Sequence, residues 1–351
     1  MRITRRGGGW ARARAYWSEG AAAVTYADVA RAQAKLLPHL PPTPLLTCAR
    51  LDALAGRELF LKCDNLQATG SFKARGALNA VLSLPALRTR GVVAHSLGNH
   101  AAAVAFAAAS RALPCTVVIP HTAPAAKVAN ARAHGATVEL CEPGTANREA
   151  ATMRIAEQLG YDIIPPYDDA HVIAGQGTLA IEMHRQLAEL QPDRPPLDAI
   201  FVPISGGGMA AGVAIATRSL SPATRVIAVE PAGKGLGASL EAGRPLWPEN
   251  LPPLSTLADG CRTAALGRIT WPICHELLDR TVVPVTDAQI TEAMRLTFDL
   301  AKLVVEPSGA MSLAAALAAA DALGVRRVGL VLCGGNVDFD QPLPFVRAAS
   351  G

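Results

Sequence analysis

The sequence is poor in aromatic residues, in lysine and in charge of either sign. Of 351 residues, 4% are aromatic, 18% are charged and six are lysine, and 33 basic against 29 acidic side chains leave a formal net charge of +4. Nucleic acids are usually bound by a clustered basic face, so we expect no nucleic-acid partner. Half of the positions are hydrophobic, which excludes a disordered or fibrous chain and allows one large core or two medium ones.

Cysteine spacing and hydrophobic runs exclude two further classes. The seven cysteines are scattered and no two are separated by two residues, so we expect a reducing cytoplasm and neither a zinc nor a redox motif. Two uncharged runs, 91–110 and 199–217, approach the length of a membrane span. The first contains His95, Asn99 and His100 and the second contains three adjacent glycines, so we expect no membrane segment.

Residues 1–23 differ from the rest of the chain. Five arginines fall within the first twenty positions, no acidic residue precedes Glu19, and an apolar block is lacking. Because a secretory signal needs such a block, we expect a basic, disordered tail. The Arg-rich, acid-poor composition leaves a mitochondrial address open as the alternative.

From residue 24 onward the pattern indicates alternating helices and strands. Thr25 and Asp28 predict a capping box that opens an amphipathic helix to Leu40, which the following prolines end. Apolar, β-branched runs then alternate with Ala-rich stretches, and we expect strands at 58–62, 91–96, 116–120, 137–141, 162–164, 199–204, 225–230 and 328–333. This alternation predicts an α/β fold with parallel sheets flanked by helices. We expect a large domain of residues 24–85 and 170–346 and a small domain of residues 86–169.

A glycine-rich turn follows the strand AIFVPI and opens a helical stretch; it consists of Ser205, Gly206, Gly207, Gly208 and Met209. Consecutive glycines let backbone N–H groups converge on an anion, and the helix N-terminus adds its positive dipole end. We therefore predict a phosphate site, with a tight turn that binds nothing as the alternative. The spacing of the glycines to Ala211, with Glu230 ending the next strand, also satisfies the dinucleotide fingerprint and leaves an NAD-dependent oxidoreductase open.

Lys73 lies in the stretch ATGSFKARGA, just past the strand ELFLK and at the opening of a helix. In an open parallel sheet this position faces the same edge as the glycine-rich turn. Gly70 permits a left-handed backbone, Ser71 is expected to cap the helix, and a pocket of low polarity beside Phe72 would lower the pKa of the amine. Such a lysine is prepared to form a Schiff base, although a solvated lysine is the ordinary alternative. A phosphate cradle and an activated lysine together indicate pyridoxal phosphate.

At this point the sequence resembles the serine/threonine dehydratase family, which uses pyridoxal phosphate and has the two-lobed tryptophan-synthase β-like fold, fold type II. The matching signature consists of Asn65, Gln67, Gly70, Ser71, Phe72, Lys73, Arg75, Gly76 and Ala77. The resemblance runs from about residue 43 to 338, through HSLGNH, VIAGQGT, ISGGGM, AVEP, LADG, EPSGA and CGGN. GALNAV after the lysine, TAP at 122–124 and TWPI at 270–273 are most similar to the serine racemase branch.

The resemblance implies a role for each candidate site residue. Lys73 would carry the cofactor, with Phe72 on the pyridine ring and Asn99 on the phenolate oxygen. The amides of the turn from Ser205 to Met209 would bind the phosphate. The substrate carboxylate would be bound by Ser96, Asn99 and His100, with Arg148 nearby. Without the resemblance, His100 would be interpreted as a buried structural histidine and Arg148 as a surface arginine.

Cys333 would face the pyridine nitrogen, where the family has a serine or a cysteine. A neutral thiol cannot hold a proton on that nitrogen, so the ring should be a weaker electron sink that favours rapid loss of the β-substituent. A buried, inert cysteine is the alternative interpretation.

Two positions depart from the racemase pattern. Racemisation needs a proton donor on each face of Cα, and Leu97 stands where that branch has a serine, so we predict dehydration without appreciable racemisation. Racemase-like members bind a divalent cation through a glutamate and an aspartate six residues later. Here these positions are Glu230 and Leu236, so we expect no metal site.

We therefore expect a dehydratase, or ammonia-lyase, that converts a 3-hydroxy amino acid such as L-threonine or L-serine to a 2-oxo acid and ammonia. The alternatives are a serine racemase-type enzyme, an NAD-dependent oxidoreductase and a non-catalytic relative that binds the cofactor. Leu97 leaves other substrates open, including a 3-hydroxyaspartate and an aryl-serine. Fifteen residues follow Asn336, so we expect no appended regulatory domain. The resemblance also implies a homodimer.

Overall fold

The computed structural model describes residues 24–96, 98–123, 125–247, 253–339, 341 and 343–346. The predictions made for the tail of residues 1–23 and for Leu97 lie outside these residues. Two sheets organise the described chain. The larger has the order β1-β2-β10-β7-β8-β9, with strands Leu45–Leu46, Glu58–Lys62, Arg327–Val331, Ala199–Pro203, Arg225–Pro231 and Val282–Val285. The smaller has the order β5-β4-β3-β6, with strands Thr137–Cys141, Cys115–Pro120, Val92–His95 and Asp162–Ile163.

All neighbouring strands are parallel except β1, which is antiparallel to β2. The prediction of an α/β fold with parallel sheets is therefore confirmed. Eight predicted strands are present, with ends that differ by at most two residues. The prediction missed β1 and β9. β1 has only two residues, and Pro284 interrupts the apolar pattern of β9, which proline can occupy because β9 is an edge strand.

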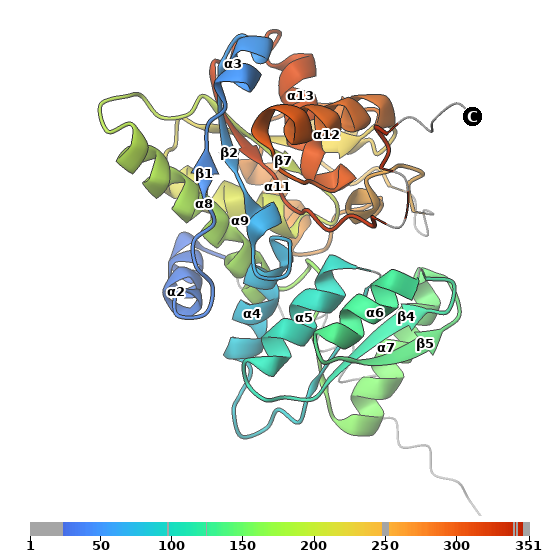
Figure 1. Cartoon of the computed structure of the whole chain (residues 1–351). Helices are drawn as coiled ribbons and strands as arrows, with labels where there is room; N and C mark the ends of the chain where they lie inside the picture. Colours follow the sequence, from blue (N-terminus) through green and yellow to red (C-terminus); the bar gives the residue numbers. More distant parts are fainter. Residues whose placement is uncertain are drawn as a thin grey trace, which may run out of the picture.

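Helices cover both faces of the larger sheet, and together they form the larger lobe (Figure 1). One face packs against α2 (Tyr26–Leu36), α8 (Ala170–Leu190), α9 (Gly208–Leu220), α10 (Leu236–Ala242) and α11 (Thr270–Leu277). The other packs against α3 (Ala49–Ala55), α12 (Asp287–Ala301) and α13 (Pro307–Ala319). Along β7, Ile200 and Val202 enter the first core and Phe201 enters the second, because successive strand residues point to opposite faces.

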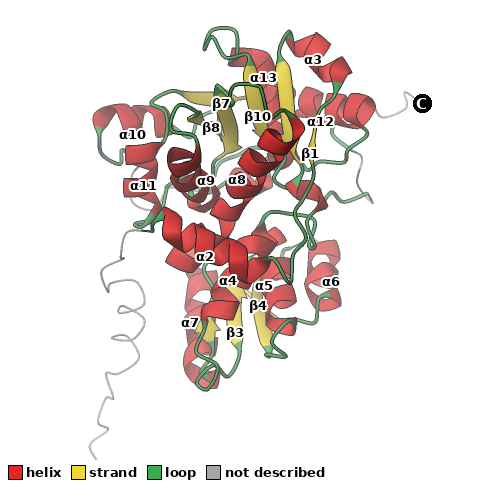
Figure 2. Cartoon of the chain, turned by 90° about the vertical axis from the view of Figure 1, so that its left-hand side faces the viewer, coloured by secondary structure: helices red, strands yellow, loops and turns green. Residues whose placement is uncertain are grey.

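The smaller sheet and its helices form the smaller lobe. Its main core contains residues of α4 (Lys73–Ser83), α5 (Asn99–Ala109) and α6 (Ala125–Ala133), whereas α7 (Thr145–Leu159) covers the opposite face. Every strand of this sheet lies within residues 92–163, but Ala74 and Leu78 of α4 also enter its core. The domain boundary at residue 85 therefore stays a proposal. α2 lies across the junction of the lobes, in contact with α4, α8 and α9 (Figure 2).

Local signals explain where α2 begins. The backbone N–H of Thr25 donates to the Asp28 carboxylate at 2.8 Å, and the predicted capping box is confirmed. The helix ends at Leu36, four residues earlier than predicted.

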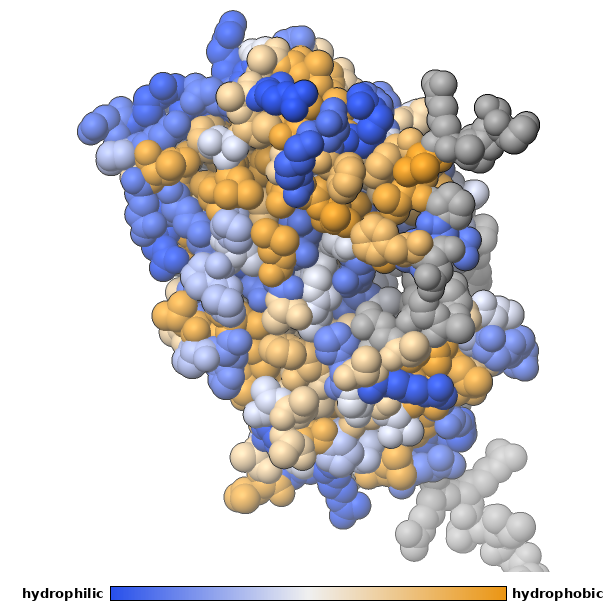
Figure 3. Space-filling view, viewed as in Figure 1, coloured by the Kyte–Doolittle hydropathy of each residue, from blue (hydrophilic) through white to orange (hydrophobic). Residues whose placement is uncertain are grey.

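Hydrophobic and hydrophilic side chains are interspersed on the face of both lobes that Figure 3 shows. No described helix combines the length and the apolar character that a membrane crossing requires.

Candidate active site

Lys73 is the first residue of α4 and follows a loop that is bonded to the end of β10. Gly70 adopts a φ of 70°, and a Cβ added there would lie 2.2 Å from a side-chain oxygen of the segment after β10. The N–H of Phe72 donates to the carbonyl of Cys333 at 3.0 Å, and that of Gly335 donates to the carbonyl of Gly70 at 2.9 Å. These bonds hold Lys73 at the carboxyl edge of the larger sheet, where ligands of parallel sheets bind.

Ser71 does not cap α4, so that prediction was wrong. The residue before the helix is Phe72, which is already helical, and no side-chain cap is formed. Ser71 is instead paired with Gly334 in an isolated β-bridge, and its buried hydroxyl has no hydrogen-bond partner among the described residues. A buried hydroxyl of this kind is available to a bound ligand.

The amine of Lys73 faces the segment that precedes α8. Its Nζ donates to the carbonyl of Pro166 at 2.5 Å and lies 5.1 Å from the centre of the Phe72 ring. Burial lowers the pKa of this amine from 10.5 to about 8. The neutral, nucleophilic form is therefore more abundant near neutral pH than in an exposed lysine, and it can attack an aldehyde.

The turn between β7 and α9 presents three backbone N–H groups that have no acceptor among the described residues. Gly207, with a φ of 96°, directly precedes α9. The carbonyl of Gly206 accepts from Oγ1 of Thr270 at 2.7 Å, and that of Gly207 accepts from the N–H of Ala211 at 2.8 Å. No described residue accepts a hydrogen bond from the N–H of Gly206, Gly207 or Gly208. Unsatisfied N–H groups at a helix N-terminus are suited to bind an anion.

Tyr167 packs against this turn. A Cβ added to Gly206 would lie 2.5 Å from the Tyr167 ring, and one added to Gly208 would lie 2.9 Å from the Tyr167 carbonyl oxygen. Both positions therefore require glycine for close packing. Because the adjacent Pro166 accepts from Lys73, one segment contacts both the amine and the turn. An amine and an open anion cradle in contact with one segment fit a phosphorylated aldehyde such as pyridoxal phosphate.

Asn99 begins α5 and joins the smaller lobe to two segments of the larger lobe. Its Nδ2 donates to Oε1 of Glu306 at 2.7 Å, and its Oδ1 accepts from Nδ2 of Asn336 at 2.9 Å. A Cβ added to Gly334 would lie 2.3 Å from the same Glu306 oxygen. Because Glu306 accepts one of the two hydrogens on Nδ2, the second is suited to a ring oxygen of the cofactor.

Cys333 lies two residues past the end of β10 and is 3% exposed. Burial raises the pKa of its thiol well above 9.0, and the Glu306 carboxylate raises it further. The thiol is therefore neutral at physiological pH.

The residues expected to bind the substrate carboxylate lie around the start of α5. Oγ of Ser96 accepts from the N–H of Gly98 at 3.2 Å. The ring of His100 is buried, and its Nε2 bonds the carbonyl of Ile164 at 2.8 Å. Burial lowers the pKa of His100 to about 3, so the ring is neutral. If His100 contributes to substrate binding, its backbone N–H in the first turn of α5 is the group that fits.

Arg148 lies on α7 and is partly buried. Burial lowers the pKa of His95 to about 4, and the positive charge of Arg148 lowers it further. Because His95 directly precedes Ser96, Arg148 influences the same strand end as the predicted carboxylate site. Its contact with a substrate stays a prediction.

Arg75, two residues after Lys73 in α4, forms a buried ionic network. Its Nε donates to Asp64 at 2.7 Å and its Nη1 donates to Glu182 at 2.7 Å, and Lys62 also donates to Glu182 at 2.7 Å. All four side chains are at most 2% exposed. The network connects β2, the residues just after it, α4 and α8.

No group of three or more His, Cys, Asp and Glu side chains arranged to hold a metal occurs among the described residues. An oxygen of Glu230 accepts from the N–H of Leu236 at 2.9 Å, and Leu236 is fully buried. A ribose hydroxyl or a cation would have to compete with this bond. Independence from metal stays a prediction.

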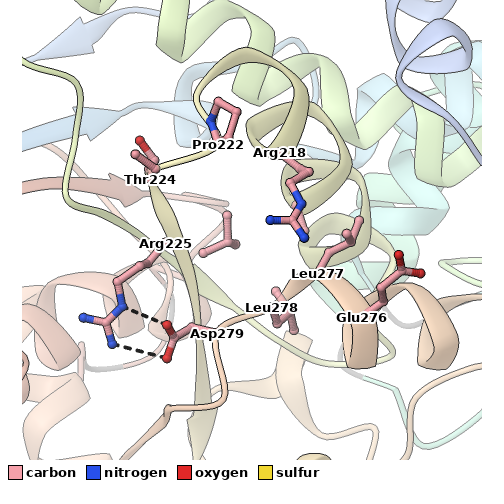
Figure 4. A pocket seen from close by; sticks show the side chains of 11 residues that line it. Arg218, Pro222, Thr224, Arg225, Glu276, Leu277, Leu278 and Asp279 are labelled. Atoms are coloured by element: carbon pink, nitrogen blue, oxygen red, sulfur yellow. Dashed lines mark hydrogen bonds and ion pairs between the residues drawn. The ribbon is translucent and has the colours of Figure 1, made fainter.

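A hollow of about 200 Å³ lies elsewhere, between the ends of α9 and α11 (Figure 4). Arg225 and Asp279 form an ion pair at its wall, with Nε to Oδ2 at 2.8 Å. Since Arg225 begins β8, this hollow lies at the amino edge of the larger sheet, and none of the predicted site residues lines it.

Sequence reasoning assigned no role to several residues that the structure brings to the site. Pro166 and Tyr167 belong to a loop with no strong motif, and the stretch YDD offered no signal for either. Glu306 lies in the motif EPSGA, which could have indicated it, and Thr270 lies in TWPI. Their contacts with Asn99 and Gly206 join residues that are far apart in the chain.

Comparisons with known proteins agree with this geometry. Residues 36–334 match the family model described as "Pyridoxal-phosphate dependent enzyme". A serine racemase of Arabidopsis thaliana is 42% identical over 318 residues, which cover 89% of this chain and 92% of that protein. An L-threo-3-hydroxyaspartate ammonia-lyase of Pseudomonas is 43% identical over 319 residues, which cover 90% of this chain and 97% of that protein. The crystal structure of a threonine deaminase from T.th. has 43% identity and a TM-score of 0.84, covering 91% of this chain and 100% of that one. The lysine, the open glycine turn and these matches remove the NAD alternative, and the chain belongs to the pyridoxal-phosphate dependent enzymes of fold type II.

Proposed function

We propose that this enzyme is a dehydratase: it eliminates water from a 3-hydroxy amino acid, and hydrolysis of the resulting enamine then releases ammonia and a 2-oxo acid. The observation that carries the proposal is that Lys73, whose amine has a pKa lowered to about 8, lies beside the segment of Cys333, whose thiol is neutral: the N–H of Phe72 donates to the carbonyl of Cys333 at 3.0 Å. Relatives named as a hydroxyaspartate ammonia-lyase and a threonine deaminase support the same reaction class.

Pyridoxal phosphate, when bound, withdraws electrons from Cα of the amino acid attached to it. Lys73, as a free amine, would take the proton from Cα. The N–H groups of Gly206, Gly207 and Gly208 would hold the phosphate, and Ser96 with the first turn of α5 would hold the substrate carboxylate. Cys333 would leave the ring nitrogen unprotonated, which favours departure of the β-hydroxyl over prolonged storage of charge on the ring.

The test is the release of ammonia and 2-oxo acid by the holoenzyme. L-serine, L-threonine, L-threo-3-hydroxyaspartate and an aryl-serine are supplied separately, and both products are quantified over time. We expect equal amounts of ammonia and 2-oxo acid from at least one substrate. Absence of both products from all four substrates, with cofactor bound, would contradict the proposal.

Racemisation is the second candidate reaction, because two relatives named serine racemase are 42% and 39% identical to this chain. Leu97 supplies no transferable proton, so we expect D-serine to form from L-serine far more slowly than pyruvate. Chiral chromatography of the reaction mixture measures both products. A rate of D-serine formation comparable with that of pyruvate would establish the racemase instead.

We also propose that the enzyme is a cytoplasmic homodimer. All seven cysteines are free thiols, which supports a reducing compartment. Light scattering during size-exclusion chromatography would give the mass of the assembly, for which we expect twice the 36.4 kDa of the chain.

A further inference from the structure

Lys234 is a buried lysine that the proposed reaction does not use. It lies in the turn between β8 and α10, between two glycines of positive φ, and is 4% exposed. Its Nζ donates to the carbonyl of Ser205 at 2.9 Å and to the carbonyl of Thr263. Burying an ammonium is costly unless its hydrogens are bonded, so the positions of these two carbonyls are coupled to the charge.

The bond to Ser205 bears directly on the glycine-rich turn. In a trans peptide the carbonyl of one residue and the N–H of the next point in opposite directions in one plane. When Lys234 holds the carbonyl of Ser205, the N–H of Gly206 must therefore point to the opposite side of the turn. Polarisation of the carbonyl by a positive charge also strengthens this N–H as a donor.

The next two peptide groups of the turn are held in the same way. Thr270 bonds the carbonyl of Gly206, and the N–H of Ala211 bonds the carbonyl of Gly207. Three successive carbonyls thus have donors, and the N–H groups of Gly206, Gly207 and Gly208 have no acceptor among the described residues. Lys234 is the charged member of these three supports.

The electrostatic surroundings keep Lys234 cationic at neutral pH. Burial lowers the pKa of its amine to about 8, and the negative charge of Glu230 acts against this decrease. Below pH 8 the ammonium form predominates. A positive charge behind the turn favours a doubly negative phosphate in front of it.

We propose that Lys234 is a positioning residue for the cofactor: its ammonium orients the Ser205–Gly206 peptide and supplies a built-in positive charge to the phosphate cradle. The inference rests on the proposed role of the glycine-rich turn in phosphate binding. It is independent of the dehydratase activity.

The experiment compares the binding of pyridoxal 5′-phosphate with that of pyridoxal, which has the same aldehyde but no phosphate. Dissociation constants for both are measured by equilibrium dialysis on apo-protein of the wild type and of Lys234→Met. We expect the variant to bind pyridoxal 5′-phosphate about 10- to 100-fold more weakly, the effect of losing a hydrogen bond to a charged group, and to bind pyridoxal unchanged. Lys302→Met is the matched control, because Lys302 is 74% exposed, and it should alter neither constant.

The experiment distinguishes failure of the phosphate role of the glycine-rich turn from failure of the proposed role of Lys234. If the wild type binds both ligands equally, the turn does not hold the phosphate. If the wild type prefers pyridoxal 5′-phosphate and Lys234→Met keeps that preference, or loses affinity for both ligands equally, Lys234 has only a structural role and the inference is wrong.

A second variant covers the case in which Lys234→Met does not fold. Lys234→Ala leaves space beside the carbonyls of Ser205 and Thr263, which ethylammonium can enter. We expect ethylammonium to restore the preference for pyridoxal 5′-phosphate in this variant, and neutral ethanol to leave it weak. Equal recovery with both additives, or with neither, would contradict a role for the charge.

Discussion

Lys73 combines a lowered pKa with a position that backbone bonds define on both sides. Burial lowers the pKa of the amine, and the negative charge of the Glu306 carboxylate acts against this decrease. The bonds of Phe72 and Gly70 to the segment after β10 keep the lysine from turning outward. Its reactivity therefore depends on packing as much as on residue type.

Replacement of Lys73 with alanine should abolish the covalent link to the cofactor and lower turnover about 1,000-fold, the range for loss of a general base. Borohydride reduction of the holoenzyme followed by mass spectrometry measures the link directly. We expect the added mass on the peptide that contains Lys73 in the wild type and nowhere in Lys73→Ala. Lys302→Ala should keep the label, and a label that persists in Lys73→Ala would show that another lysine carries the cofactor.

At the scale of elements, two residues near the start of α4 have different roles. Lys73 at its start points toward the site, and Arg75 points into the buried network with Asp64 and Glu182. Burial raises the pKa of Glu182, but the hydrogen bond and charge of Arg75 outweigh this, and the pKa is lowered overall. Glu182 therefore stays ionised, and the network connects the helix to β2 and α8.

Arg75→Met should destabilise the fold by about 3–5 kcal/mol, because two buried carboxylates would retain only Lys62 as a cationic partner. Urea unfolding of the apo-protein measures this change in the free energy of unfolding. Arg295→Met is the matched control, since Arg295 pairs with Glu292 on the exposed face of α12, where solvent screens the pair, and its loss should change the stability far less. An equal decrease in the free energy of unfolding in the two variants would show that the buried network stabilises the fold no more than an exposed ion pair does.

For the whole molecule, three partly or fully buried histidines link stability to pH. Burial lowers the pKa of His95 and His184 to about 4 and that of His100 to about 3. In the unfolded chain these rings would take up protons below about pH 6.5, whereas in the folded chain they stay neutral until about pH 4. The unfolded state therefore binds more protons in this window, and stability falls as the pH decreases.

As the pH falls from 6.5 to 5, each of these histidines should reduce the free energy of unfolding with a slope that grows from about 0.7 towards about 1.4 kcal/mol per pH unit. Urea unfolding at several pH values gives the slope. His184→Gln, which can still bond the hydroxyl of Thr217, should reduce the histidine part of the slope by about one third. An unchanged slope in this variant would show that the pKa of His184 is the same in the folded and the unfolded chain.

The sequence by itself determined the alternation of elements, the glycine-rich turn and the position of Lys73 at a helix start. These depend on local properties, namely hydrophobic periodicity and the backbone freedom of glycine, which neighbouring residues carry. The same local reasoning was wrong for Ser71, because the β-bridge with Gly334 comes from a segment far away in the chain.

Only the tertiary structure decided which polar groups meet. The bonds of Lys73 to Pro166, of Asn99 to Glu306 and of Lys234 to Ser205 all join different elements. None has a periodicity or spacing in the chain that could predict it. Their distances, and the burial that lowers the pKa of both lysines, arise only when the carboxyl ends of the strands come together at one edge.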